Sequence, residues 1–392
     1  MKIKNYSVRS LARRFYSLIE DCCTVAPQDS GRAIWLEQIP TDNIFEANHS
    51  ERITYSKAGR IWKGQKPIEN SGVCVVEDAA VWMLRPKDSL FRDQMLRQAI
   101  IFNRNGKRIS CPGGRRVLPY IFRGQWRSWL LDKNKRNNFQ GRVAILGNFV
   151  MDSYNYYHFW ADTIADIWFI NQILPEDKRP ERYLIPFVDL PWQRQILELC
   201  GINMDKVIPF HQHDHIAVES LIVPIRDKGA GTLPPWLSKA IRSSVGWKET
   251  RIAGNRLIYL SRANAPRRRL SNEHILLEPL LKEGFVVHTL DGLSVREQQH
   301  LFSEAAVIVA PHGAALTNVV WCQPGTVVVE LLSENYLVPC FRDLSWQTGL
   351  VYHPIVCKQV STQEQGITGD IVITPEQIKY VLEFVVRRAQ CI

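Results

Sequence analysis

The sequence lacks the short motifs that define several common enzyme classes. It contains no GxxxxGK[ST], so a phosphate-loop NTPase is not indicated, and no GxGxxG after a strand-like run, so a dinucleotide dehydrogenase is poorly supported. It also has no GxSxG, which argues against an α/β-hydrolase. A ligand site must therefore be sought in other patterns.

Cysteine pairs and long apolar runs are missing as well. The 9 cysteines include no CxxC, so they indicate neither a disulfide framework nor a zinc ribbon, and we expect reduced, mostly buried thiols. No run approaches the ~20 apolar residues that span a bilayer. The opening MKIKNYSVRSLARRF lacks the apolar core of a secretory signal. We therefore expect a cytoplasmic protein.

Positive charge, in contrast, is in excess. The formal net charge is +10, and part of it is concentrated at residues 2–14 and 133–136. Such a balance favours anionic partners, which include nucleotide phosphates, nucleic acid and acidic membrane surfaces. The N-terminal cluster suggests peripheral contact with an anionic inner membrane, although a solvated helix face is the more usual explanation.

The length of 392 residues exceeds what one hydrophobic core usually supports, so we expect two domains. Apolar residues make up 45% and charged residues 22%, which is ordinary for a globular chain. We predict a partly helical N-terminal extension over 1–70, a β-rich and then Rossmann-like domain over 71–235, and a second Rossmann-like domain over 236–392. The Asn105-Gly106 pair is a strong hairpin signal in the β-rich part.

Strand-like and helix-like segments alternate in both later regions. In the first, a strand over 142–146 precedes a loop over 147–157 and a helix over 158–174. In the second, the expected strands are 256–260, 286–289, 307–310 and 326–331, and the expected helices are 272–283, 295–305, 314–321 and 375–388. This alternation predicts the α/β class, with parallel sheets covered by helices on both faces.

The segment 307–332 is the strongest candidate ligand site. A β-branched run leads into His312 and Gly313, and the helix predicted to follow leaves backbone N–H groups free at its start, where anions such as phosphates bind. Thr317 and Asn318 can contact a ligand or merely satisfy the start of that helix. Glu330, expected near the end of the next strand, can hold a ribose diol or lie on the surface.

Arginines follow the strand predicted over 256–260. Arg262 and Arg268 precede a helix, and guanidinium groups bind phosphate oxygens bidentately. A solvated basic loop is the alternative. Because the sequence has no Asp-x-Asp to clamp a metal, a diphosphate here would have to be held by arginine and by helix N-termini.

A histidine and a carboxylate lie four residues apart in the first half. His158 and Asp162 share a face if this segment is helical, so Asp162 can act as a base or orient His158 for proton transfer. Helix capping and aromatic packing are the alternative. A third group, His211, His213 and His215, could bind a metal, but no cysteine or second carboxylate lies nearby at ligand spacing, so we expect no metal there.

Three of these segments together resemble glycosyltransferase family 61. They read N-Y-Y-H-x-x-x-D from residue 155, S-R-x-x-x-x-R-R-R-x-x-N-E from residue 261, and H-G-A-A-L-T-N from residue 312 followed by P-G-x-x-V-x-E. The resemblance implies a GT-B fold with two Rossmann-like domains facing a central cleft. It also implies inverting, metal-independent transfer from a nucleotide sugar such as a UDP-sugar, with no cofactor.

The resemblance also implies roles for individual residues. Asp162 matches the general base and His158 its neighbour. The donor-binding residues are Arg262, Arg268, His312, Gly313, Ala314, Leu316, Thr317, Asn318 and, by analogy with GT-B enzymes generally, Glu330. Asn155 and Tyr157 fall on the acceptor side.

Without the signal anchor and cysteine pairing of secretory-pathway members, the chain is similar to bacterial members associated with capsular or other surface polysaccharides. The acceptor would be a hydroxyl of a glycan or lipid-linked glycan. Two alternatives stay open: a basic polyanion- or membrane-binding module without catalysis, and a nucleotide-dependent enzyme of another class. A nucleic-acid partner is not expected, because no RNP-like aromatics and no DNA-binding helix are recognisable.

Overall fold

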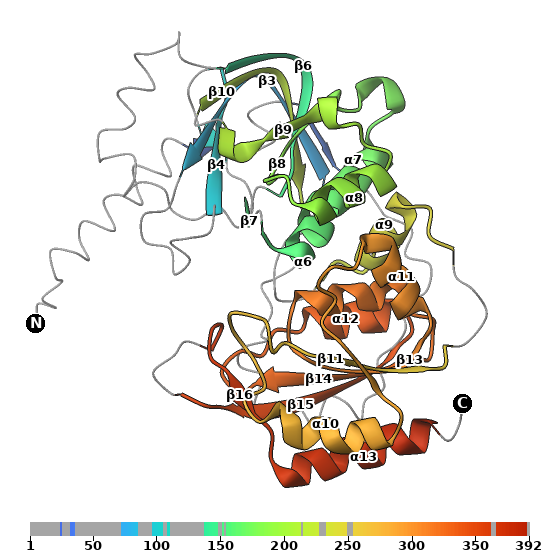
Figure 1. Cartoon of the computed structure of the whole chain (residues 1–392). Helices are drawn as coiled ribbons and strands as arrows, with labels where there is room; N and C mark the ends of the chain where they lie inside the picture. Colours follow the sequence, from blue (N-terminus) through green and yellow to red (C-terminus); the bar gives the residue numbers. More distant parts are fainter. Residues whose placement is uncertain are drawn as a thin grey trace, which may run out of the picture. The chain divides into compact units, whose positions relative to one another are not determined.

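The computed structural model describes residues 24–25, 32–35, 72–84, 96–104, 108–109, 137–147, 151–152, 154–212, 215–226, 233–248, 254–361 and 366–389. The described residues fall into two compact units, one over 68–190 and 202–228 with the two short strands before it, the other over 191–201 and 229–392. Most of the predicted N-terminal extension and both basic clusters lie outside the described residues. Figure 1 shows the course of the chain.

The first unit is built on a 10-stranded mixed sheet. Its strands are β1 (Thr24–Val25), β2 (Arg32–Trp35), β3 (Gly72–Leu84), β4 (Leu96–Phe102), β5 (Arg108–Ile109), β6 (Asn137–Ile145), β7 (Met151–Asp152), β8 (Arg182–Ile185), β9 (Val207–Pro209) and β10 (His215–Ile225). β10, β6, β8 and β9 run parallel in that spatial order, and β3 joins β10 antiparallel. The lead-in and the Rossmann-like part therefore share one continuous sheet.

The β-rich lead-in supplies the antiparallel half of this sheet. The turn predicted at Asn105-Gly106 lies outside the described residues, but β4 and β5 on either side of it pair antiparallel. Strands β3, β6 and β10 bury a shared apolar core, in which Val76, Val143 and Leu221 have no exposed surface. The runs Val143–Ile145 of β6 and Leu221–Ile225 of β10 are buried without alternation, as in strands that are covered on both faces, whereas β10 alternates before them.

The predicted helix over 158–174 is three helical segments instead of one. Residues Tyr156–His158 form α6, Phe159–Ile164 form the π-helix η4, and Ala165–Ile173 form α7. α7 packs against β10 and β3. The helix therefore begins two residues earlier than expected, and a wider turn interrupts it, which is a feature found often at functional sites.

The second unit holds a six-stranded sheet. Its strands lie in the order β12 (Val286–His288), β11 (Arg256–Leu260), β13 (Ala305–Pro311), β14 (Val327–Ser333), β15 (Val351–Gln359) and β16 (Ile371–Val372). All neighbours are parallel except β15 and β16. Counted along the chain, this order is 2-1-3-4-5-6, whose first five strands match a doubly wound, Rossmann-like sheet.

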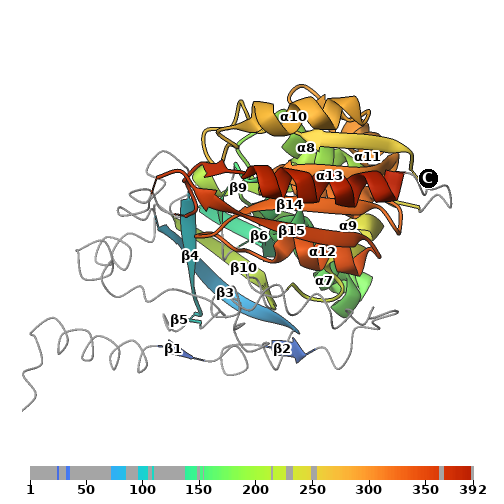
Figure 2. The ribbon, with the colours of Figure 1, turned by 90° about the horizontal axis from the view of Figure 1, so that it is seen from below.

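Helices cover both faces of the second sheet (Figures 1 and 2). α10 (Glu273–Lys282) and α13 (Pro375–Ala389) lie side by side on one face. On the other lie α9 (Leu237–Ser244), α11 (Val295–Ser303), α12 (Cys340–Gln347) and the 3-10 helix η8 (Ala314–Trp321). α8 (Pro191–Leu199) belongs to this unit through contacts with α11. The α/β class is confirmed.

The central strands explain how the segment 307–332 folds. All seven residues of β13 and all seven of β14 are buried, as their unalternated apolar runs predict. The strand predicted over 326–331 runs from Val327 to Ser333 instead, so the expectation that Glu330 lies near a strand end was wrong: it is the fourth residue of β14 and has no exposed surface. The bounds predicted for β11 and η8 are confirmed, although η8 is a 3-10 helix.

Among the described residues, no helix is long and apolar enough to cross a membrane.

Candidate functional site

The second sheet has a topological switch point between β11 and β13. The chain leaves β11 toward the face carrying α10 and leaves β13 toward the face carrying η8. Loops that diverge in this way open a crevice at the carboxyl ends of the strands, where ligands of doubly wound sheets bind. Residues 261–272 and 312–313 form these two loops, so the arginine segment and the His312 segment come together as the sequence predicted.

Arg262 crosses from the first loop to the second. Its Nε donates to the carbonyl of Arg268 at 3.3 Å and its Nη2 to the carbonyl of Arg267 at 3.0 Å. A Cβ added to Gly313 would overlap the Arg262 guanidinium. Gly313 was predicted to allow close approach of its backbone, and the group that uses this space in the structure is Arg262.

Arg268 is held in an unusual backbone conformation. Its φ of 53° lies in the left-handed region, which costs a residue with a Cβ about 1–2 kcal/mol. The side chain donates to the carbonyl of Ile367 at 2.5 Å and of His312 at 3.4 Å, and it lies 5.3 Å from the ring centre of Tyr336. These contacts direct the guanidinium toward the start of the second loop.

The guanidinium groups of Arg262 and Arg268 are hydrogen-bonded to the backbone and not to acidic side chains of the described residues. Among the described residues, their hydrogen bonds go to backbone carbonyls. Burial, together with the charges of Arg268 and Arg267, lowers the pKa of Arg262 to about 10. Burial also lowers the pKa of Arg268. A site whose positive charge is costly in the absence of ligand binds an anion favourably, because the anion removes that cost.

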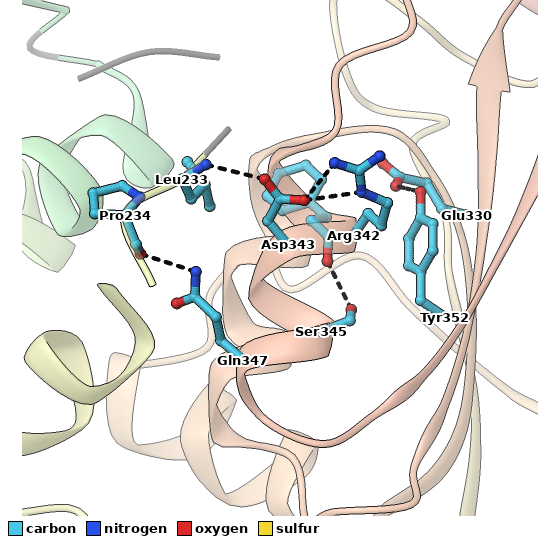
Figure 3. A network of polar contacts seen from close by, with 9 residues as sticks. Leu233, Pro234, Glu330, Arg342, Asp343, Ser345, Gln347 and Tyr352 are labelled. Carbon is cyan, nitrogen blue, oxygen red and sulfur yellow. Dashed lines mark hydrogen bonds and ion pairs between the residues drawn. The ribbon is translucent and has the colours of Figure 1, made fainter. Parts of the chain in front are cut away.

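His312 lies at the base of this loop and pairs with Glu330. The distance from Nδ1 of His312 to Oε1 of Glu330 is 2.5 Å. The other carboxylate oxygen accepts a hydrogen bond from the Tyr352 hydroxyl on β15 (Figure 3). Both oxygens of Glu330 thus have partners inside the protein. The carboxylate is not exposed, so it is not available for the predicted contact with a ribose.

The polar side chains of the short helix η8 are hydrogen-bonded within the protein. Thr317 donates to the carbonyl of Ala314 at 2.7 Å, and Asn318 contacts Gln298 on α11 at 2.9 Å and the indole of Trp321 at 3.0 Å. Leu316 is a core side chain with no exposed surface. Thr317 thus bonds within the first turn of the helix, whereas Asn318 bonds α11 and the last residue of η8. Contact of either side chain with a ligand stays a prediction.

In the first unit, His158 and Asp162 form the expected pair. Nδ1 of His158 lies 2.7 Å from Oδ2 of Asp162. The two side chains differ in exposure, with 23% for His158 and 9% for Asp162. The histidine is therefore the member of the pair that solvent or a substrate reaches more readily.

The predicted acceptor-side residues beside this pair have structural roles. The Asn155 side chain caps α6 by accepting from the backbone N–H groups of Tyr157 at 3.0 Å and His158 at 3.3 Å. Tyr157 is buried and meets the His158 ring edge-on, with ring centres 5.1 Å apart. Capping and aromatic packing thus hold His158 in place, and contact with an acceptor stays a prediction.

A buried ion pair next to this site was not predicted from the sequence. Arg226 follows β10, and its Nε lies 2.7 Å from Oδ1 of Asp166 on α7. Arg226 also donates to the carbonyl of Ala161 in the π-helix at 2.7 Å, and Asp166 accepts from the N–H of Gly147 after β6 at 3.0 Å. In the sequence, the only indication of a role for Asp166 is its position four residues beyond Asp162. Nothing near Arg226 indicates the pair, because its partner is distant in sequence.

The histidine cluster has other partners. Nδ1 of His211 lies 2.8 Å from the carbonyl oxygen of Phe187, and the His215 ring stacks on Trp82. His213 lies outside the described residues. Within the described part of the chain, no group of three or more His, Cys, Asp or Glu residues is placed to hold a metal.

Part of the chain matches a known protein family. Residues 156–329 match the sequence model of the family described as Glycosyltransferase 61. The matched range begins at α6 and ends in β14, so it includes the His158 pair, both arginines and His312. This match indicates that the protein is a glycosyltransferase. The match confirms the resemblance to family 61 that the motifs indicate.

Two plant proteins are similar over shorter segments. The chain is 34% identical over 97 residues to "Beta-1,2-xylosyltransferase RCN11" of Oryza sativa subsp. japonica, which covers 22% of this chain and 18% of that protein. It is 33% identical over 73 residues to "Beta-1,2-xylosyltransferase" of Arabidopsis thaliana, which covers 19% of this chain and 13% of that protein. The matched segment spans less than a fifth of either relative.

Proposed function

We propose that the protein is an inverting glycosyltransferase that moves a sugar from a nucleotide-sugar donor to a hydroxyl of a glycan or lipid-linked glycan. The observation that carries the proposal is the pair of half-buried guanidinium groups at the switch point of the second sheet, where the described residues offer them carbonyl oxygens but no carboxylate partner. The family match and the two xylosyltransferase relatives support the same reaction class.

In this proposal, the second unit binds the donor. Arg262, Arg268 and the backbone N–H groups at the start of η8 would bind the diphosphate, which leaves with the electron pair of the bond to the anomeric carbon. Fixed cationic donors stabilise that developing charge without reorganisation, so the site supplies what a metal ion supplies in other sugar transferases. We accordingly expect metal-independent transfer and no cofactor.

The first unit supplies the base. The resemblance assigned this role to Asp162, but the observed exposures favour a division of labour in which His158 takes the proton from the acceptor hydroxyl and Asp162 orients its ring. A carboxylate bound to Nδ1 fixes the proton on that nitrogen and leaves Nε2 as the basic atom. In the same step, the acceptor oxygen attacks the anomeric carbon from the side opposite the leaving diphosphate. Such a single displacement inverts this carbon.

The biological setting is a further part of the proposal. We propose a GT-B architecture and a cytoplasmic enzyme of surface polysaccharide synthesis, with peripheral contact to an anionic inner membrane through residues 2–14. The names of the relatives make xylose the first donor sugar to examine, and UDP is the first nucleotide.

The decisive experiment measures UDP binding by calorimetry and sugar transfer with a panel of UDP-sugars. For Arg262→Ala, we expect UDP affinity to fall about 10- to 100-fold, the usual effect of losing hydrogen bonds to a charged group. Arg269→Ala is the matched control, because Arg269 is exposed and pairs with Asp370 at 2.8 Å. It should bind UDP as the unchanged protein does.

The outcomes separate the competing functions. Equal UDP affinity in both variants would overturn the assignment of the donor site. Arg262-dependent UDP binding without transfer or hydrolysis of any nucleotide sugar would instead indicate a nucleotide-dependent enzyme of another class. Failure of UDP to bind, combined with tight and steeply salt-dependent polyanion binding, would indicate a binding module.

A further inference from the structure

One segment of the second unit lies against the arginine loop but belongs to none of the sequence motifs. Residues 366–371 lie between β15 and β16 and include the first residue of β16, beyond residue 329, where the family match ends. They run beside residues 268–271, and Leu270 forms a parallel bridge with Ile371. The role proposed for this segment rests on the proposed function, because the neighbouring loop is the one that would bind the donor diphosphate.

The backbone of the arginine loop is hydrogen-bonded to this segment. The N–H of Arg268 donates to the carbonyl of Thr368 at 3.4 Å, and the N–H of Ile371 donates to the carbonyl of Arg269 at 2.9 Å. The N–H of Ser271 in turn donates to the carbonyl of Ile371 at 2.9 Å. The course of the loop is therefore supported by a part of the chain that is distant in sequence.

Asp370 adds a side-chain contact with the same backbone. Its Oδ1 accepts a hydrogen bond from the N–H of Arg269 at 2.8 Å, across 101 residues of chain. Its Oδ2 lies 2.8 Å from Nη2 of the Arg269 side chain. One carboxylate oxygen thus holds the backbone N–H that follows Arg268, and the other forms an ion pair.

These contacts surround a residue with an unfavourable backbone conformation. The φ of 53° at Arg268 lies in the left-handed region, and such conformations persist where the surrounding structure fixes them. From this backbone, the guanidinium donates to the carbonyls of Ile367 and His312 and lies over the ring of Tyr336. Ile367 belongs to segment 366–371, which therefore binds both the backbone and the side chain of Arg268.

The same segment contacts the loop after β14. A Cβ added to Gly366 would overlap the carbonyl oxygen of Asn335, the residue before Tyr336. Segment 366–371 thus contacts both the arginine loop and the loop that carries Tyr336. Both loops follow the carboxyl ends of parallel strands, where ligands of doubly wound sheets bind.

The charge of Asp370 does not suit direct contact with the donor, because a carboxylate repels a diphosphate. We propose that Asp370 is a positioning residue for donor binding. It holds the N–H of Arg269 and thereby the left-handed turn at Arg268, so that the Arg268 guanidinium is in place before the nucleotide arrives. Fixing a long side chain in advance reduces the conformational entropy that is lost on binding.

The test compares the UDP affinity of two Asp370 variants by calorimetry. Asp370→Ala removes both carboxylate oxygens, so UDP affinity should fall about tenfold. Asp370→Asn keeps an acceptor oxygen for the Arg269 N–H, and its affinity should stay within about threefold of that of the unchanged protein. Tighter UDP binding by both variants would mean that Asp370 acts by its charge alone, and the positioning role would be wrong.

A double-mutant cycle tests whether Asp370 acts through Arg268. In an Arg268→Ala background, Asp370→Ala should change UDP affinity by less than about twofold, because the side chain that it positions is gone. The full loss in that background would contradict the role. Glu278→Ala is the matched control, since Glu278 on α10 also forms an ion pair of 2.8 Å, with Lys282, and it should bind UDP as the unchanged protein does.

A measurement without nucleotide shows whether Asp370 holds the loop. Hydrogen exchange of the peptide that contains residues 266–272 should be faster in Asp370→Ala than in Asp370→Asn, because only alanine leaves the Arg269 N–H without its side-chain acceptor. Equal exchange in the two variants would refute the contact. Thermal unfolding shows whether each variant is folded, and Asp370→Leu, which also lacks both oxygens, replaces an alanine variant that is not.

Failure of the inference is distinguishable from failure of the proposed function. If UDP does not bind the unchanged protein, the proposed function fails, and the donor-positioning role fails with it. If UDP binds in an Arg262-dependent manner but Asp370→Ala keeps full affinity, the donor site stands and the positioning role is wrong.

Discussion

Each unit of the protein contains a histidine whose Nδ1 contacts a carboxylate, and the two pairs are built differently. His158 and Asp162 are four residues apart within one helical segment, and the histidine side chain is 23% exposed. His312 and Glu330 are 18 residues apart, join a loop to the middle of a strand, and have side-chain exposures of 7% and 0%. The first pair is local and accessible, whereas the second is part of the core.

The contrast bears on what each histidine can do. An accessible imidazole with a fixed tautomer can exchange its proton with a substrate, as a general base must. A buried imidazole that is hydrogen-bonded to a fully buried carboxylate is instead held in place within the core. The same contact therefore serves proton removal in one unit, by our proposal, and joins a loop to the core in the other.

The largest expected effect comes from the first pair. His158→Gln should lower kcat for sugar transfer by about 10²- to 10⁴-fold, because it removes the proposed base, while the affinity for UDP stays unchanged. Asp162→Asn should lower kcat less, since an orienting group is lost but the imidazole remains. Steady-state kinetics with a UDP-sugar and calorimetry with UDP give the two quantities.

The ranking of these two variants tests the exposure argument. A larger loss in Asp162→Asn than in His158→Gln would return the base role to Asp162, as the family resemblance implied. Glu176→Gln, an exposed carboxylate in the short 3-10 helix after α7, is the control and should keep full activity.

The next effect concerns the ion pair behind the first site. Asp166→Asn leaves Arg226 almost fully buried without its counter-charge, which should lower the free energy of unfolding by about 3–5 kcal/mol. Urea unfolding measures this change. The exposed pair of Arg142 and Glu181 is the matched control, and Glu181→Gln should change stability by less than about 1 kcal/mol. Equal effects in the two variants would mean that Asp166 does not support the fold around the π-helix.

The smallest effect concerns the contact between the two loops of the second unit. Gly313→Ala places a methyl group where the Arg262 guanidinium lies, so UDP affinity should fall about tenfold and stability by about 1–3 kcal/mol. In an Arg262→Ala background, the space is vacant, and the same substitution should then cost little stability. A double-mutant cycle in urea shows this coupling; additive effects would contradict the proposed overlap.

The sequence predicted the second unit better than the first. The run VIVAP and the small residues after it identified β13 and η8, because a parallel strand buried on both faces leaves a continuous apolar pattern. Pairing of His158 with Asp162 also followed from spacing. The π-helix did not, since its apolar residues suit an ordinary helix. Arg226, which donates to the Ala161 carbonyl of this helix, lies 65 residues away in the chain.

The position of Glu330 shows a different limit of sequence analysis. Local pattern placed a carboxylate near a strand end, where a ligand would reach it. Its actual partners are His312, in the loop after β13, and Tyr352, on β15. Both strands lie beside β14, and strand order cannot be derived from one segment. Tyr352 has no motif of its own and becomes recognisable only when the sheet is assembled.

The left-handed backbone of Arg268 has a consequence for protein engineering. A stability-guided redesign would choose glycine at this position, because glycine adopts a φ of 53° without the penalty that arginine carries. Such a variant should be more thermostable and yet bind nucleotide worse. Residue 268 is thus a place where screening for stability and screening for activity will select opposite sequences.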